Sequence, residues 1–115
     1  MAVVHLVAIP CQISPGVFSS ERVFEVVLKN GERHQGVAPR FFCWNEQGQV
    51  VSEDEPADIA DGMVAAKLLD RGVNDYAVVE VPDGEVIAVE KSAVRKRPTE
   101  IVPPGEKPSH VFVGS

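Results

Sequence analysis

The residues of this chain that offer nucleophilic chemistry are two cysteines and three histidines. A thiol reacts at neutral pH when a neighbouring imidazole ionises it. Cys43 with His34 or His5 is the combination that would serve, but their spacing in the sequence does not bring them together. Cys43 also lies between two phenylalanines and a tryptophan, which is typical of a small buried side chain. We therefore assign no catalytic residue, and a small thiol-dependent enzyme is the third of three functional hypotheses.

Carboxylates gather in residues 53–61 (EDEPADIAD), which hold five acidic side chains and no cation. Carboxylate oxygens are ligands that calcium and magnesium prefer, but the stretch lacks the glycine and glutamate positions of an EF-hand loop. The two cysteines have no Cys-x-x-Cys pairing and do not make a metal site alone. We expect a solvated loop, with no metal and no cofactor.

A basic cluster in the sequence KSAVRKR is the candidate nucleic-acid site. Cations of this kind neutralise phosphates, although no aromatic side chain for base stacking lies nearby. The alternative is a charged sheet edge that blocks strand addition. The formal net charge of −6 also argues against general affinity for nucleic acid. RNA or ribonucleoprotein binding is therefore the second hypothesis, and its residues are Lys91, Arg95, Lys96 and Arg97.

Phe18, Phe41, Phe42 and Trp44 are four of the chain's seven aromatic residues. Aromatic side chains in loops or at sheet ends are frequent anchors of protein interfaces. In a chain with so few aromatic residues they are also the natural core. Trp44 precedes the polar sequence Asn-Glu-Gln-Gly, and we expect it to lie partly at the surface. The candidate partner-binding residues are Phe41, Phe42 and Trp44.

Two hairpins must position these side chains, in a chain whose 21 valines, 5 isoleucines and 4 leucines favour sheet. The apolar runs 23–29 and 32–38 flank Asn30-Gly31, which predicts a type I′ turn. The runs 76–81 and 85–90 flank Asp83-Gly84 in the same way. Pro82 donates no hydrogen bond and therefore marks the end of a strand or an edge.

The two hairpins look like copies of one unit. At a spacing of 53 residues Gly31 falls on Gly84, and flanking positions match at similar spacings. The pattern predicts half-units at about 1–51 and 63–97, joined by an acidic connector over 52–62. Both belong to one β domain over residues 1–97.

Residues 52–72 allow two interpretations. Ser52 and Glu55 form a possible capping box, and apolar residues recur near helical spacing, which predicts a helix over about 55–71. Gly62 lies inside that helix, and the repeat places residues 63–69 where 3–9 form a strand. We favour an acidic loop to about Asp61, followed by a strand.

The segment 98–115 contains four of the nine prolines and is expected to be an extended tail. Val111, Phe112 and Val113 are candidates for a terminal edge strand. At the other end, no basic residue precedes the apolar opening and no A-x-A-like cleavage site follows it. No apolar run approaches the roughly 18 residues that span a bilayer. We expect a soluble cytoplasmic protein without membrane contact.

Residues 63–97 resemble the small Src-homology-3-like barrels of the Tudor and KOW kind. The likeness lies in a strand, a glycine-containing loop, a strand led by Tyr76 that ends in Pro-Asp-Gly, a returning strand, and an apolar step at Ala93-Val94 before basic residues. The resemblance implies a small barrel. Tyr76 is the only aromatic residue in this segment, so the aromatic cage of Tudor domains is absent. KOW barrels often bind ribosomal RNA or polymerase, which draws attention to the basic end.

These patterns together predict an all-β fold, with six to eight short antiparallel strands closed or nearly closed as a small barrel. An α+β fold with one helix is the alternative. The first functional hypothesis is a non-catalytic interaction domain. It would bind a protein partner, or a second copy of itself, through an exposed edge strand or through the Phe41–Trp44 end.

Overall fold

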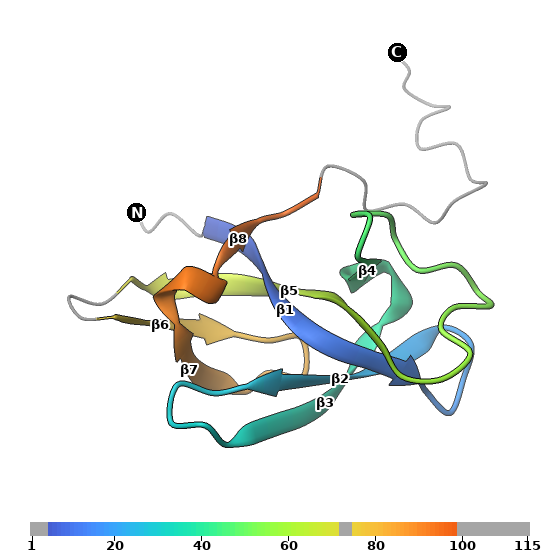
Figure 1. The fold of residues 1–115 in the computed structure, drawn as a ribbon, viewed down its shortest axis with the longest axis horizontal. Helices are drawn as coiled ribbons and strands as arrows, with labels where there is room; N and C mark the ends of the chain where they lie inside the picture. The colour runs from blue at the N-terminus through green and yellow to red at the C-terminus, as the bar shows by residue number, and fades with distance from the viewer. Residues whose placement is uncertain (1–4, 72–74, 99–115) are drawn as a thin grey trace, which may run out of the picture.

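The computed structural model describes residues 5–71 and 75–98. Its strands form one curled antiparallel sheet that makes a half-barrel (Figure 1), which confirms the predicted all-β fold. Along the main path the strand order is β3-β2-β1-β5-β6-β7, while β4 pairs with β5 and β8 pairs with β1. The strands are β1 His5–Pro15, β2 Glu21–Val27, β3 Arg33–Pro39, β4 Cys43–Asn45, β5 Ala60–Asp70, β6 Tyr76–Glu80, β7 Val86–Glu90 and β8 Arg95–Lys96, with the 3-10 turns η1 Arg40–Phe42 and η2 Lys91–Ala93.

The alternative helix over 55–71 is wrong, because β5 occupies most of that segment. β5 pairs with β1 along one edge and with β4 and β6 along the other, so tertiary pairing overrides the helical spacing of its apolar residues. The predicted capping pair does form one of its hydrogen bonds. The Ser52 N–H donates to Glu55 Oε1 at 3.0 Å, but within a turn.

The main core fills the inner side of the curled sheet. Alternate residues of the central strands point inward, among them Ile9 and Ile13 from β1 and Val64 from β5, and they meet Phe24 and Val79 from the neighbouring strands. This period of two is what a half-buried strand requires. The inward-facing residues of the two long central strands, β1 and β5, therefore supply much of this core.

A smaller cluster lies on the opposite face of the sheet, and Trp44 is at its centre. Trp44 packs with Ala8, Val50 and Ala65 and is 0% exposed, so the expectation that it lies partly at the surface is wrong. The polar sequence after it folds into a tight turn, in which the Asn45 N–H donates to the Gln49 carbonyl at 2.8 Å. That turn brings Val50 back beside the indole ring.

Both hairpins have the same turn, and it differs from the predicted type I′. Gly31 and Gly84 have φ of 91° and 92°, but no non-glycine residue in the described chain has a positive φ. A type I′ turn needs positive φ at both central residues. The observed loops have three residues, and the glycine N–H donates to the carbonyl of Leu28 or Val81 at 2.9 Å. Pro82 fits this turn because its ring fixes a negative φ.

The two halves of the sheet have corresponding connections. β1 and β5 form the central pair, and each half lends its last short strand to the other half. The two short strands also pair at similar places. In the pair β4–β5 Trp44 lies opposite Met63, and in the pair β8–β1 Arg95 lies opposite Ala8. The duplication of the sequence and the bounds of its half-units remain predictions, while β4 pairs with β5 and β8 pairs with β1.

Candidate binding surfaces

The cysteines are buried, and the structure does not give Cys43 a catalytic partner. Its thiol lies 3.8 Å from the Pro39 carbonyl, to which it donates. His34 instead donates from Nε2 to Asp83 Oδ2 at 2.8 Å. Burial raises the pKa of Cys43 to about 12 and also raises the pKa of Cys11. A thiol with such a pKa is protonated at neutral pH and is a poor nucleophile.

The Arg22 side chain holds the loop that contains the acidic stretch against the sheet. The Arg22 guanidinium is buried and donates to five carbonyl oxygens. Three of these belong to the loop before β5, at Ser52, Glu53 and Glu55. Within the described residues no three acidic, histidine or cysteine side chains gather as metal ligands would. The role of Arg22 is not among the predictions from the sequence, although its alternation with Phe24 and Val26 places it on the inner face.

The basic cluster is divided by the fold. Arg97 is used inside the structure, because its guanidinium donates to the carbonyls of Val7 at 2.9 Å and Ala66 at 3.1 Å. Arg95 and Lys96 are exposed on β8, and Lys91 begins η2. Arg97 is therefore not a free cation for phosphate, although sequence spacing grouped it with the other three.

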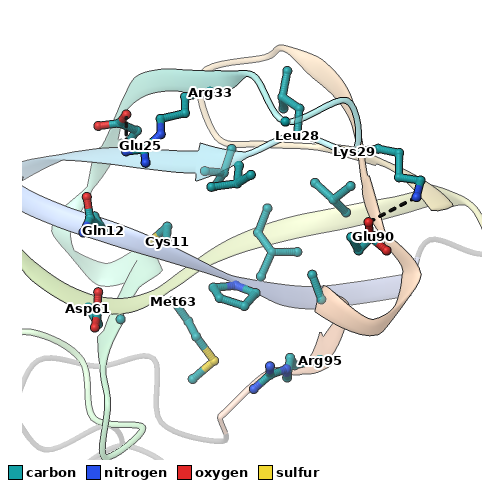
Figure 2. A pocket seen from close by; sticks show the side chains of 18 of the residues that line it. Cys11, Gln12, Glu25, Leu28, Lys29, Arg33, Asp61, Met63, Glu90 and Arg95 are labelled. Atoms are coloured by element: carbon teal, nitrogen blue, oxygen red, sulfur yellow. Dashed lines mark hydrogen bonds and ion pairs between the residues drawn. The ribbon is translucent and has the colours of Figure 1, made fainter. Parts of the chain in front are cut away.

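An open pocket of about 800 Å³ lies between the first hairpin, η2 and the central strands. Figure 2 shows Lys29 bonded to Glu90 at one side of this pocket, with Met63 and Arg95 on another. Charged side chains of both signs line it, and its acidic groups include Glu46 and Asp61. Acidic groups in the pocket that Arg95 lines disfavour the close approach of a phosphate backbone.

Three of the phenylalanines are at the surface. Phe18, Phe41 and Phe42 are 67%, 43% and 37% exposed, so the expectation that the four aromatic residues form the core is wrong for these three and right for Trp44. Phe41 and Phe42 belong to η1, directly after β3. Val37, on the outer face of β3, is also exposed. Exposed aromatic side chains next to an edge strand are suited to contact with another chain.

β3 is an edge strand whose outer backbone groups are unpaired in the described residues. Leu28 donates to the Glu32 carbonyl at 2.7 Å, and hydrogen-bonded pairs alternate along an antiparallel ladder. The even-numbered residues of β3 therefore face β2. Arg33, Gln35 and Val37 direct their N–H and C=O groups away from it.

The opposite edge strand, β7, is closed at its centre. The Lys29 N–H donates to the Ala88 carbonyl at 2.8 Å, and Lys29 Nζ also contacts Asp75 Oδ2 and Glu90 Oε2 at 2.9 and 3.1 Å. In the second hairpin Pro82 stands where Lys29 stands in the first. Proline has no N–H, so the second turn makes no matching bond to β3. The second turn contacts β3 through side chains instead, since His34 Nε2 bonds Asp83 Oδ2 at 2.8 Å.

Comparisons with models of protein families, with curated proteins and with solved structures find no match to this chain. The likeness of residues 63–97 to Src-homology-3-like barrels thus remains a resemblance. Neither of the two short helices in the described chain is long or apolar enough to cross a membrane.

Proposed function

We propose that this chain is a non-catalytic interaction domain that binds an extended segment of a partner protein along β3. The observation that carries the proposal is the unpaired outer edge of β3 beside the exposed side chains of Phe41 and Phe42. An added strand would satisfy the free N–H and C=O groups of Arg33, Gln35 and Val37, and the aromatic side chains would contact its apolar residues.

The charges at the end of β3 favour a partner segment that carries a cation. A pocket of about 480 Å³ lies beside Phe41, and its charged lining residues are Glu21, Glu53 and Arg40, so acidic side chains outnumber basic ones. A lysine or arginine of the partner would be attracted to these carboxylates, and complementary charge increases the rate and specificity of association.

The test compares two substitutions at one position of β3. Val37→Pro removes an outward N–H, whereas Val37→Ile keeps it and serves as the matched control. Each protein carries an N-terminal tag and is used to capture partners from its source lysate with and without nuclease. We expect a stoichiometric protein that survives nuclease, is kept by Val37→Ile and is lost with Val37→Pro.

Phe41→Ser provides a second variant, in case proline disturbs β3 itself. Far-ultraviolet circular dichroism and thermal unfolding establish that each variant is folded. Capture by folded Val37→Pro and Phe41→Ser that equals capture by the wild type would overturn the proposal. Capture that disappears with nuclease would favour RNA binding through Lys91, Arg95 and Lys96.

A further inference from the structure

We propose that the pocket between β1, the first hairpin and η2 binds a short peptide whose two ends are free. Its carboxylate contacts Arg95, its ammonium group contacts Asp61, and an apolar side chain between them enters a gap between β1 and β2. The site does not use the outer edge of β3, so this inference does not depend on the proposed function.

The gap in the sheet is at Pro10. β1 pairs with β2 only from Gln12 onward and with β8 only as far as Ala8, so no described strand pairs with Pro10 on that side. The even-numbered residues of β2 face β3, and the backbone of Val27 therefore faces β1. Proline has no N–H to donate, and the pairing of β2 with β1 ends at Glu25. Val27 thus offers backbone groups to a peptide that lies in the gap.

The middle of the pocket is apolar. Pro10 lies opposite Met63 in the pair β1–β5, and cross-strand partners share one face of a sheet. The buried core residues Ile9, Val26 and Val89 also line the pocket. A side chain of the size of leucine that enters the gap would lose its apolar surface to these residues, and such burial is favourable.

Groups of opposite charge lie at the two ends of this apolar part, and Figure 2 shows Met63 between Asp61 and Arg95. Asp61 lies opposite Gln12 on β1. Arg95 lies opposite Ala8, so the two positions are four residues or about 13 Å apart along β1. An extended peptide of three residues covers about 10 Å, and the long arginine side chain can cover the remainder.

The two end groups are available to a ligand. Four other charged side chains of the pocket are paired with each other, Lys29 with Glu90 and Arg33 with Glu25. Among the described residues no ion pair includes Arg95 or Asp61. A ligand with one negative and one positive end complements both groups, whereas Asp61 repels a ligand that is only anionic.

The experiment titrates the full chain with the peptide Ala-Leu-Ala and follows the Val27 amide and the Met63 methyl group by NMR. We expect saturable shifts of both signals, with a Kd of the order of 1 mM. The N-acetylated and the C-amidated peptides are the matched ligands. Each should bind about threefold more weakly, because an ion pair at an exposed side chain contributes modestly.

Two variants assign the ends of the peptide. In Arg95→Gln the free and the amidated peptide should bind equally, and in Asp61→Asn the free and the acetylated peptide should bind equally. Lys96→Gln is the control, since Lys96 lies on the same strand with its side chain on the other face. It should keep both preferences of the wild type. The amide spectrum of each variant establishes that it is folded.

Three results would overturn the inference. One is the absence of saturable shifts at about 10 mM peptide, which is well above the expected Kd. Another is a threefold preference for free ends that persists in both Arg95→Gln and Asp61→Asn. The third is a set of shifts around Phe41 without shifts of Val27 and Met63, because the peptide would then bind at another surface.

Discussion

At the scale of single residues, the Arg22 side chain is the hydrogen-bond donor to a group of backbone carbonyls. One guanidinium satisfies five of these acceptors, and three of them fix the loop between the two halves. A planar, forked donor is required, since an ammonium group does not reach acceptors on several sides at once.

We expect Arg22→Ala to lower the free energy of unfolding by about 3 kcal/mol or more, because the carbonyls would be buried without donors. Arg22→Lys should recover only part of this loss. Urea unfolding measures both. Arg33→Ala is the control, since Arg33 is exposed and its ion pair with Glu25 is worth at most about 1 kcal/mol. Similar losses for Arg22→Ala and Arg33→Ala would contradict the structural role of Arg22.

The buried thiols predict a loss of stability in alkali. A cysteine in the unfolded chain has a pKa of about 8.5. Below this pH the thiols are protonated in both the folded and the unfolded chain, so they do not change the pH dependence of stability. Above it the unfolded chain loses protons that Cys43, with its raised pKa, retains until about pH 12. Stability should therefore fall over this window by up to about 1.4 kcal/mol per pH unit for each thiol.

The measurement is urea unfolding under reducing conditions at several pH values between 7.5 and 10. Cys43→Ala should show a shallower decline, because one of the two thiols no longer titrates. A decline of the same slope in Cys43→Ala would show that other groups cause the alkaline loss.

At the scale of elements, Gly62 sets how closely β4 approaches β5. A Cβ at this position would collide with the Trp44 carbonyl and with the side chain of Ile13. Glycine in a strand often marks such a close approach of backbones. In this molecule it allows the short strand β4 to pair and the Trp44 side chain to reach its cluster.

We expect Gly62→Ala to cost about 1–3 kcal/mol of stability, because β4 would have to move away from β5. The near-ultraviolet circular dichroism of Trp44 should weaken in the same variant, since the indole would lose its fixed surroundings. Ala60→Gly, at the exposed start of β5, is the control and should leave this signal unchanged. An unchanged Trp44 signal in Gly62→Ala would show that the approach is not as tight as described.

The elements could be predicted from the sequence where local pattern determines them. The two hairpins follow from apolar runs around a glycine turn, and β5 follows from the expected correspondence with the first strand. The two halves match at a spacing of 53 residues at the turns, but not along the strands. By strand pairing, Phe24 opposite Ile13 corresponds to Val79 opposite Leu68, which is a spacing of 55 residues. Trp44 opposite Met63 corresponds to Arg95 opposite Ala8, which is a spacing of 51 residues. The arms of the first hairpin have seven residues each and those of the second have five.

The rest depended on distant contacts that no sequence window contains. Trp44 is buried because the following turn returns Val50 to it, and Arg97 is occupied because β8 crosses to β1. The unpaired backbone groups on the outer edge of β3 are also a tertiary feature, since they depend on which hairpin turn donates a backbone hydrogen bond to which edge strand. Of the candidate partner-binding residues, Phe41 and Phe42 remain at the surface.

At the scale of the whole molecule, the two hairpins hold each other. The first turn reaches β7 through Lys29, and the second reaches β3 through the hydrogen bond between His34 and Asp83. Asp83 also lies against Gly36, where a Cβ would collide with its carboxylate. These contacts bring the two ends of the curled sheet together.

A double-mutant cycle of His34→Ala and Asp83→Ala should give a coupling of about 0.5–1.5 kcal/mol, because both side chains are mostly buried. The more exposed pair Arg33 and Glu25 should give less than about 0.5 kcal/mol. Chemical unfolding of the four proteins in each cycle supplies the values. A coupling near zero for the first pair would mean that the turns do not support each other there.

The exchange of β4 and β8 has a consequence for a chain that is cut. Because each half carries the closing strand of the other, neither half contains a complete sheet of its own. Fragments 1–57 and 58–115 should therefore be unfolded when separate and should assemble into a one-to-one noncovalent complex when mixed, with far-ultraviolet circular dichroism as the readout. A sheet signal from either fragment alone would contradict this. The covalent link between the halves then acts mainly to keep two complementary polypeptides at a fixed ratio and a high local concentration.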